Sequence, residues 1–136
     1  MSDTAARFDA ADFADELPTP GFYRSAIVTA RWRRSERGND MVQVVHALEG
    51  APPGHDHVSE YFVIAGGTDR GRALSRRRLV QLYRACGLEP RAGEGIETAD
   101  LLGARLEVRV EHELYQGQAR LRVAGHRRPG SAATPF

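Results

Sequence analysis

One segment with helical periodicity, set between two groups of strand-like segments, most constrains what this chain can fold into. Apolar residues recur there at the spacing of a single helix face, at Leu79, Leu82, Tyr83 and Cys86. Ser75 has the side chain of an N-cap, and Gly87 stands where a helix commonly ends. We therefore predict one helix over residues 75–86, with the three arginines at 76–78 in its first turn.

The segments on either side of this helix have the composition of β-strands. Strands are predicted before the helix at 21–34, 41–48 and 57–66, and after it at 106–111 and 119–125. Both alternating phases of the first segment are apolar, which predicts a bulge or a strand shared by two sheets. The order β-β-β-α-β-β is that of the five-stranded OB-fold, a small mainly-β barrel with one helix between strands three and four, and a helix-capped open sheet is the alternative.

The length of 136 residues fits one domain. Because Pro18 and Pro20 stop any regular element, we expect a flexible acidic leader over residues 1–17, the OB-fold domain over 18–128 and a flexible tail over 129–136. The sequence leaves open what the leader and the Pro-Phe end of the tail do.

Composition also indicates a compartment. No apolar run approaches the ~20 residues that a membrane-spanning helix needs, so no membrane partner is expected. The first residues lack the basic start and apolar centre of a secretory signal, and a single cysteine excludes an internal disulfide. These features predict a cytoplasmic location.

The arginines provide the candidate binding site. All 19 basic residues are arginines, and residues 1–20 hold five acids against one arginine, so the net charge of +1 conceals a basic remainder. Cations along a phosphate track, together with flat side chains that stack on bases, are what a single-stranded nucleic-acid groove needs. The candidate nucleic-acid-binding residues are Arg24, Arg31, Trp32, Arg33, Arg34, Arg37, Tyr61, Tyr115, Arg120 and Arg122. The alternative is a solvated hairpin whose Trp32 packs into the core.

Four short motifs carry a resemblance to a known family. They are a Pro-Gly-aromatic opening at residues 20–22, the helix end L-x-x-L-x-x-A-x-G at 79–87, the step D-L-L-G-x-R-L at 100–106, and a Y-x-G hairpin at 115–117. Over residues 17–129 the chain resembles a family of phage and prophage proteins long known only as a domain of unknown function. Those proteins look like OB-fold single-stranded-DNA-binding proteins, so the resemblance implies DNA binding in phage or prophage recombination or replication, inside a bacterial or phage-infected cell. The family usually carries lysines and a Lys-Gly or Ser-Gly first hairpin, where this chain has the arginine-containing turn SERGND.

No catalytic signature is found in the sequence. It has no G-x-S-x-G motif, no phosphate-cradling glycine loop and no compact acidic cluster, so we predict neither enzymatic activity nor a cofactor. His55-x-His57 offers two possible metal ligands beside a Pro-Pro-Gly loop, a weak signal from which no metal is predicted.

Two further possibilities stay open from the sequence. The first is an OB-like protein-interaction module that recruits a recombination or replication enzyme, which would show a contiguous apolar surface patch. The second is RNA as the ligand, because only contacts to the 2′-hydroxyl distinguish RNA from DNA. A homo-oligomer, which would present several barrels to one strand, is compatible with either.

Overall fold

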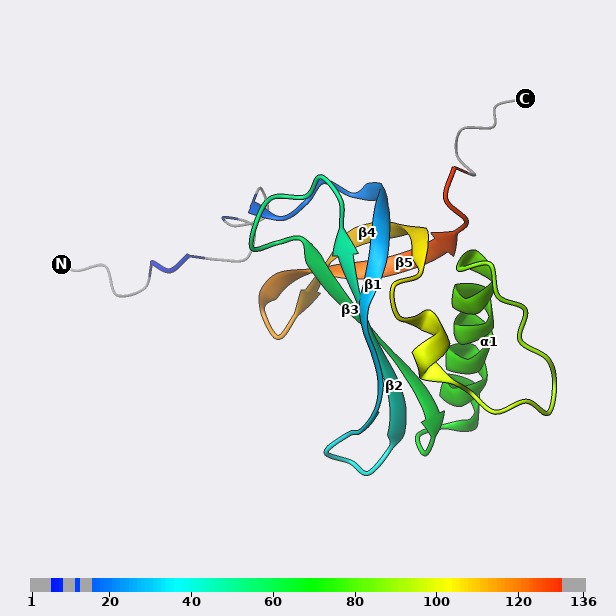
Figure 1. Ribbon diagram of the computed structural model, residues 1–136. Coiled ribbons are helices and arrows are strands. Elements are labelled where there is room, and N and C mark those ends of the chain that lie inside the picture. The colour runs from blue at the N-terminus through cyan, green and yellow to red at the C-terminus, as the bar shows by residue number, and fades with distance from the viewer. Residues whose placement is uncertain (1–5, 9–11, 13–15, 131–136) are drawn as a thin grey trace.

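The computed structural model describes residues 6–8, 12 and 16–130, and its regular elements form one antiparallel sheet and one α-helix (Figure 1). Much of the predicted leader and of the predicted tail lies outside the described residues. The elements are β1 (Gly21–Arg34), β2 (Asp40–Leu48), β3 (His57–Ala65), α1 (Asp69–Ala85), the 3₁₀ turn η2 (Thr98–Leu101), β4 (Arg105–Tyr115) and β5 (Gln118–Arg127). The predicted element order is therefore confirmed.

The long strand β1 stands at the centre of the sheet, whose order is β3-β2-β1-β4-β5. Residues 21–26 of β1 pair with β4 and residues 25–34 pair with β2, where the register shifts between Ile27 and Thr29. This irregularity confirms the predicted bulge. It also explains the two apolar phases of β1, because Ser25 and Ile27 face the core before the shift and Ala30 faces it afterwards.

The edge strands β3 and β5 approach each other without forming a ladder among the described residues, so backbone hydrogen bonds do not close the sheet. Side chains join them instead. The carboxylate of Glu60 on β3 lies 2.8 Å from Nε2 of His126 on β5. The helix α1 packs against both of these strands, and its predicted apolar face contributes Leu79, Leu82 and Tyr83 to the core.

The helix begins earlier than the sequence predicted. It starts at Asp69, and Thr68 is the N-cap, with its Oγ1 accepting a 3.0 Å hydrogen bond from the Gly71 N–H. The prediction of Ser75 was wrong because the first turns are polar and contain a glycine, so they show no apolar periodicity. The arginines at 76–78 therefore lie in the middle of the helix, away from its N-terminal dipole. The glycine expected at the other end is confirmed, since Gly87 follows the helix with φ +83°.

None of the described helices combines the length and the apolar character that crossing a lipid bilayer requires.

Replacing Thr68 by alanine should lower the free energy of unfolding by about 1 kcal/mol, because the variant loses the oxygen that caps the Gly71 N–H. Ser75→Ala should leave that free energy unchanged or slightly raised, because alanine is the better residue in a helix interior. Urea denaturation of both variants measures the difference. The reverse ranking would contradict the observed start of the helix.

Candidate nucleic-acid interface

Three neighbouring strands carry a row of polar side chains on the face of the sheet opposite the core. Arg31 of β1 pairs with Gln43 of β2, which in turn pairs with Tyr61 of β3. The flanking residues of β2, Val42 and Val44, are fully buried, so side-chain alternation directs this row outward. The row places a cation on β1 and an exposed aromatic ring on β3, with the buried Gln43 between them on β2.

Gln43 connects the members of this row through hydrogen bonds. Its Oε1 accepts from Nε of Arg31 at 3.0 Å and from Nη1 of Arg33 at 3.3 Å. Its Nε2 donates to the Tyr61 hydroxyl at 3.3 Å. We call Arg31, Arg33, Gln43 and Tyr61 the outer row. Gln43 was not predicted as a site residue because a lone glutamine in a strand has no distinctive pattern.

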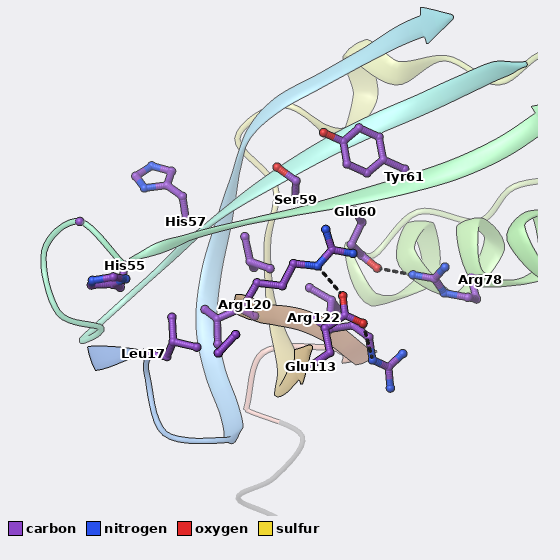
Figure 2. Close-up of a pocket in the computed structure, with 15 residues that line it drawn as sticks. Leu17, His55, His57, Ser59, Glu60, Tyr61, Arg78, Glu113, Arg120 and Arg122 are labelled. Carbon is purple, nitrogen blue, oxygen red and sulfur yellow. Dashed lines mark hydrogen bonds and ion pairs between the residues drawn. The ribbon is translucent and has the colours of Figure 1, made fainter. Parts of the chain in front are cut away.

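A cleft of about 660 Å³ opens between β3 and β5, next to the outer row. Tyr61 lines it and so belongs to both features. Figure 2 shows Arg120 reaching from β5 toward Ser59 and Tyr61 on β3. Arg122 also lines the cleft, and Leu17, from the end of the predicted leader, lies at its border. The structure therefore gathers Tyr61, Arg120 and Arg122 around the cleft, and the hydrogen bonds of Gln43 extend this surface from Tyr61 to Arg31 and Arg33.

The arginines of this surface differ in how far acids neutralise them. Nε of Arg120 donates to Glu113 at 2.6 Å, and the Arg120 guanidinium stacks on the Tyr115 ring at 3.7 Å. Arg122 donates to Glu111 at 2.9 Å, and this hydrogen bond lowers the pKa of the Glu111 carboxyl. Arg31 and Arg33 instead bond a neutral amide, and within the described chain neither is in an ion pair with a carboxylate. The uncompensated positive charge of the surface is thus on the outer row.

The other predicted residues lie elsewhere. Trp32 sits opposite buried Val42, so its side chain belongs to the core face of β1, where 47% of the residue remains exposed. Arg34 is paired with Asp40 at 3.3 Å, and Arg37 lies in the turn between β1 and β2. Arg24 pairs across β1 and β4 with Glu107. The structure therefore separates Trp32 from Arg31 and Arg33 by the thickness of the sheet.

A buried ionic cluster lies on the core side of the cleft. Oε2 of Glu60 is 2.7 Å from Nε2 of His46 and 2.8 Å from Nε2 of His126, while Oε1 accepts from Arg78 at 2.8 Å. The side chains of Glu60 and both histidines are at most 2% exposed. Burial alone would raise the pKa of Glu60, but the hydrogen bonds from His126 and His46 outweigh it and lower the pKa to about 2.

Sequence reasoning missed this cluster, although a signal for it exists. Glu60 falls in the apolar phase of β3 together with Val58, Phe62 and Ile64, and His46 falls in the buried phase of β2. A charged residue in the buried phase of a strand requires a partner in the core. By contrast, His55 and His57, the pair considered from the sequence, are not grouped with a third possible metal ligand among the described residues.

A scan of the chain against protein-family models finds no match, and a search of curated proteins finds none of significant similarity. The family resemblance therefore stays a prediction.

Because Glu60 is charged in the folded chain, the free energy of unfolding should depend on pH in the acidic range. Its pKa falls from 4.5 to about 2 on folding, so the unfolded chain binds a proton that the folded chain does not. The contribution, roughly 3 kcal/mol, should be complete above pH 4.5 and lost as the pH falls toward 2. Urea unfolding over this range measures it, with Glu60→Gln as the control that lacks the titrating group. Equal pH dependence in the two proteins would show that Glu60 does not titrate there.

Proposed function

We propose that this chain binds single-stranded DNA with little sequence preference, along the outer row and into the cleft between β3 and β5. The observation that carries the proposal is the outer row itself, in which Gln43 connects two arginines without carboxylate partners to an exposed tyrosine. Single strands are bound by this combination, with cations following the phosphates and aromatic rings stacking on the bases. Stacking accepts any base, so it gives affinity without strong sequence specificity.

We further propose that the sheet is an OB-fold barrel that is open between β3 and β5. The strand neighbours β3-β2-β1-β4-β5, with β3 and β5 facing each other, are those of a five-stranded OB barrel. In such barrels the ligand lies on the second and third strands, between the loops that follow the first and fourth strands. Here these strands carry Gln43 and Tyr61, and the loop after β4 lies next to Arg120. The proposed fold and the proposed surface support each other.

The arginines would contribute unequally to DNA binding, because some are paired with carboxylates and others are not. Arg31 and Arg33 offer charge to phosphates at the least cost, because they give up only hydrogen bonds to an amide. Arg120 and Arg122 must share their charge with Glu113 and Glu111, so they contribute less per residue. Gln43 holds the two arginines of β1 and the tyrosine of β3 in a fixed arrangement, which reduces the entropy lost on binding.

The biological setting that we propose is DNA recombination or replication in a phage or prophage, in the cytoplasm, with a recombination or replication protein as a further partner. This setting follows from the family resemblance. The alternative is an interaction module that does not hold DNA, and it predicts that the wild type fails to bind oligothymidine even at low salt.

Removing both outer-row arginines should weaken DNA binding more than removing two arginines elsewhere. We expect Arg31→Gln/Arg33→Gln to reduce the slope of log affinity against log salt by about 1.4, because each phosphate contact with a single strand contributes about 0.7. The matched control, Arg70→Gln/Arg77→Gln, removes the same net charge from exposed positions on α1 and should leave most of the binding intact. Fluorescence anisotropy of labelled oligothymidine over a series of salt concentrations measures both. Equal losses of affinity in the two variants would indicate that binding depends on positive charge spread over the whole protein and not on the outer row. No binding by the wild type at low salt would favour the interaction module.

Tyr61 rather than Trp32 should be the stacking residue. Tyr61→Ala should cost ~1–3 kcal/mol of binding free energy, while Tyr61→Phe, which keeps the ring, should cost much less. Trp32 lies on the opposite face of β1, so its emission should change little when oligothymidine saturates the protein. The same titration, followed by anisotropy and by tryptophan emission, gives both results. Strong quenching of Trp32 would place the DNA on the other face of the sheet.

A further inference from the structure

Three possible metal ligands converge inside the protein, from three strands that are distant in sequence. His46 comes from β2, Glu60 from β3 and His126 from β5. One ligand atom from each lies within 4.8 Å of the others, and the described residues contain no second group of this kind. Both imidazole Nε2 atoms approach the same carboxylate oxygen, Oε2 of Glu60, at 2.7 Å and 2.8 Å.

We propose that His46, Glu60 and His126 bind one divalent transition-metal ion of the Zn²⁺ class. Two imidazole nitrogens and one carboxylate oxygen are ligands that such ions favour over Mg²⁺ or Ca²⁺, which prefer oxygen alone. On binding, the ion replaces the protons through which the two rings now bond Oε2: each neutral ring then carries its single proton on Nδ1, and any second proton of a charged ring is released to solvent.

The two distances to Oε2 require only a small adjustment. Ligand atoms at about 2.0–2.1 Å from a tetrahedral ion stand about 3.3 Å apart, so each ring would retreat from Oε2 by roughly half an ångström. Arg78 donates to the other carboxylate oxygen, Oε1, at 2.8 Å, and Nε2 of His126 also lies 2.9 Å from Oε1, so the carboxylate is held between Arg78 and the two histidines. Movements of this size are available to side chains without a change in the sheet.

We expect the fourth coordination position to face the cleft between β3 and β5. Glu60 and Arg78 both line the cleft between β3 and β5, so the ion can enter there and keep a water molecule. The protein would thus supply three of the four ligands, and water would supply the fourth. The ion would also tie β3 to β5, the two edges that no ladder joins, so binding should raise the stability of the folded chain.

Two features set the expected strength of the site below that of closed zinc sites. Among the described residues, neither Nδ1 atom of His46 or His126 has a hydrogen-bond partner. Such outer partners typically improve metal affinity 10–100-fold, so their lack weakens this site. The positive charge of Arg78 on the same carboxylate acts in the same direction. We therefore expect a dissociation constant far above those of four-ligand structural zinc sites.

Metal titration of the full chain, stripped with a chelator, tests the proposal. With ZnCl₂ in competition with a chromophoric chelator, we expect one ion per chain and a higher melting temperature. His126→Gln should abolish this uptake, whereas His55→Gln/His57→Gln, which removes two histidines outside the cluster, should retain it. No uptake by the wild type, or uptake that only the His55/His57 variant loses, would overturn the proposal.

A second measurement uses the wild type, because removing a buried histidine can unfold the domain. In ¹⁵N-histidine NMR spectra, Zn²⁺ should shift the Nε2 resonances of two of the five histidines, His46 and His126, and leave the other three in place. Shifts confined to the other histidines would overturn the proposal even if an ion binds. The result does not depend on the proposed function, since the triad points into the core and the outer row points away from it.

Discussion

The carboxylate of Glu60 is the group on which the rest of the structure depends. A charged carboxylate in a protein interior is tolerated only when it is paired and hydrogen-bonded, and Glu60 meets that condition through His46, His126 and Arg78. These partners come from β2, β5 and α1, so the need to solvate one anion fixes the relative positions of four elements. Leucine at this position would be easier to bury, but it would not determine which side chains of β5 meet β3.

The arginines on the two sides of the sheet differ in whether a carboxylate neutralises them. On β4 and β5 each arginine of the cleft has a glutamate one strand away, as in Arg120 with Glu113 and Arg122 with Glu111, so the charges cancel locally. On β1 and β2 a neutral residue, Gln43, takes the place of the acid. This single difference, amide in place of carboxylate, leaves the positive charge of Arg31 and Arg33 available to a ligand. A net charge of +1 for the whole chain does not reveal such a separation.

Much of the fold follows from local patterns in the sequence. Alternation and helical periodicity predicted five strands, one helix and the bulge in β1, all of which the structure contains. The start of α1 was not predictable from the apolar face, because the turns from Asp69 onward face solvent. Strand alternation separates Trp32 from Arg31 and Arg33, as the solvated-hairpin alternative supposed, whereas grouping them in one site relied on their proximity in the sequence. The buried triad required the pairing of strands that are distant in sequence, since residues 46, 60 and 126 meet only when β5 comes to face β3.

Strand β3 carries one member of the buried cluster and one member of the outer row at consecutive positions. Glu60 faces inward and Tyr61, the next residue, faces outward, so any movement of one backbone position displaces both side chains. Arg78 holds Glu60 and also lines the cleft that Tyr61 borders. Loss of the Glu60 charge would therefore disturb the edge of the proposed binding surface without removing any of its cations. Arg31 and Arg33 stand on β1, two strands away from this edge, so substitutions there change the surface charge and leave the buried cluster intact. Substitutions of Glu60 or its partners thus test whether the buried cluster positions the binding surface. Substitutions of Arg31 and Arg33 test whether the charge of that surface binds the ligand.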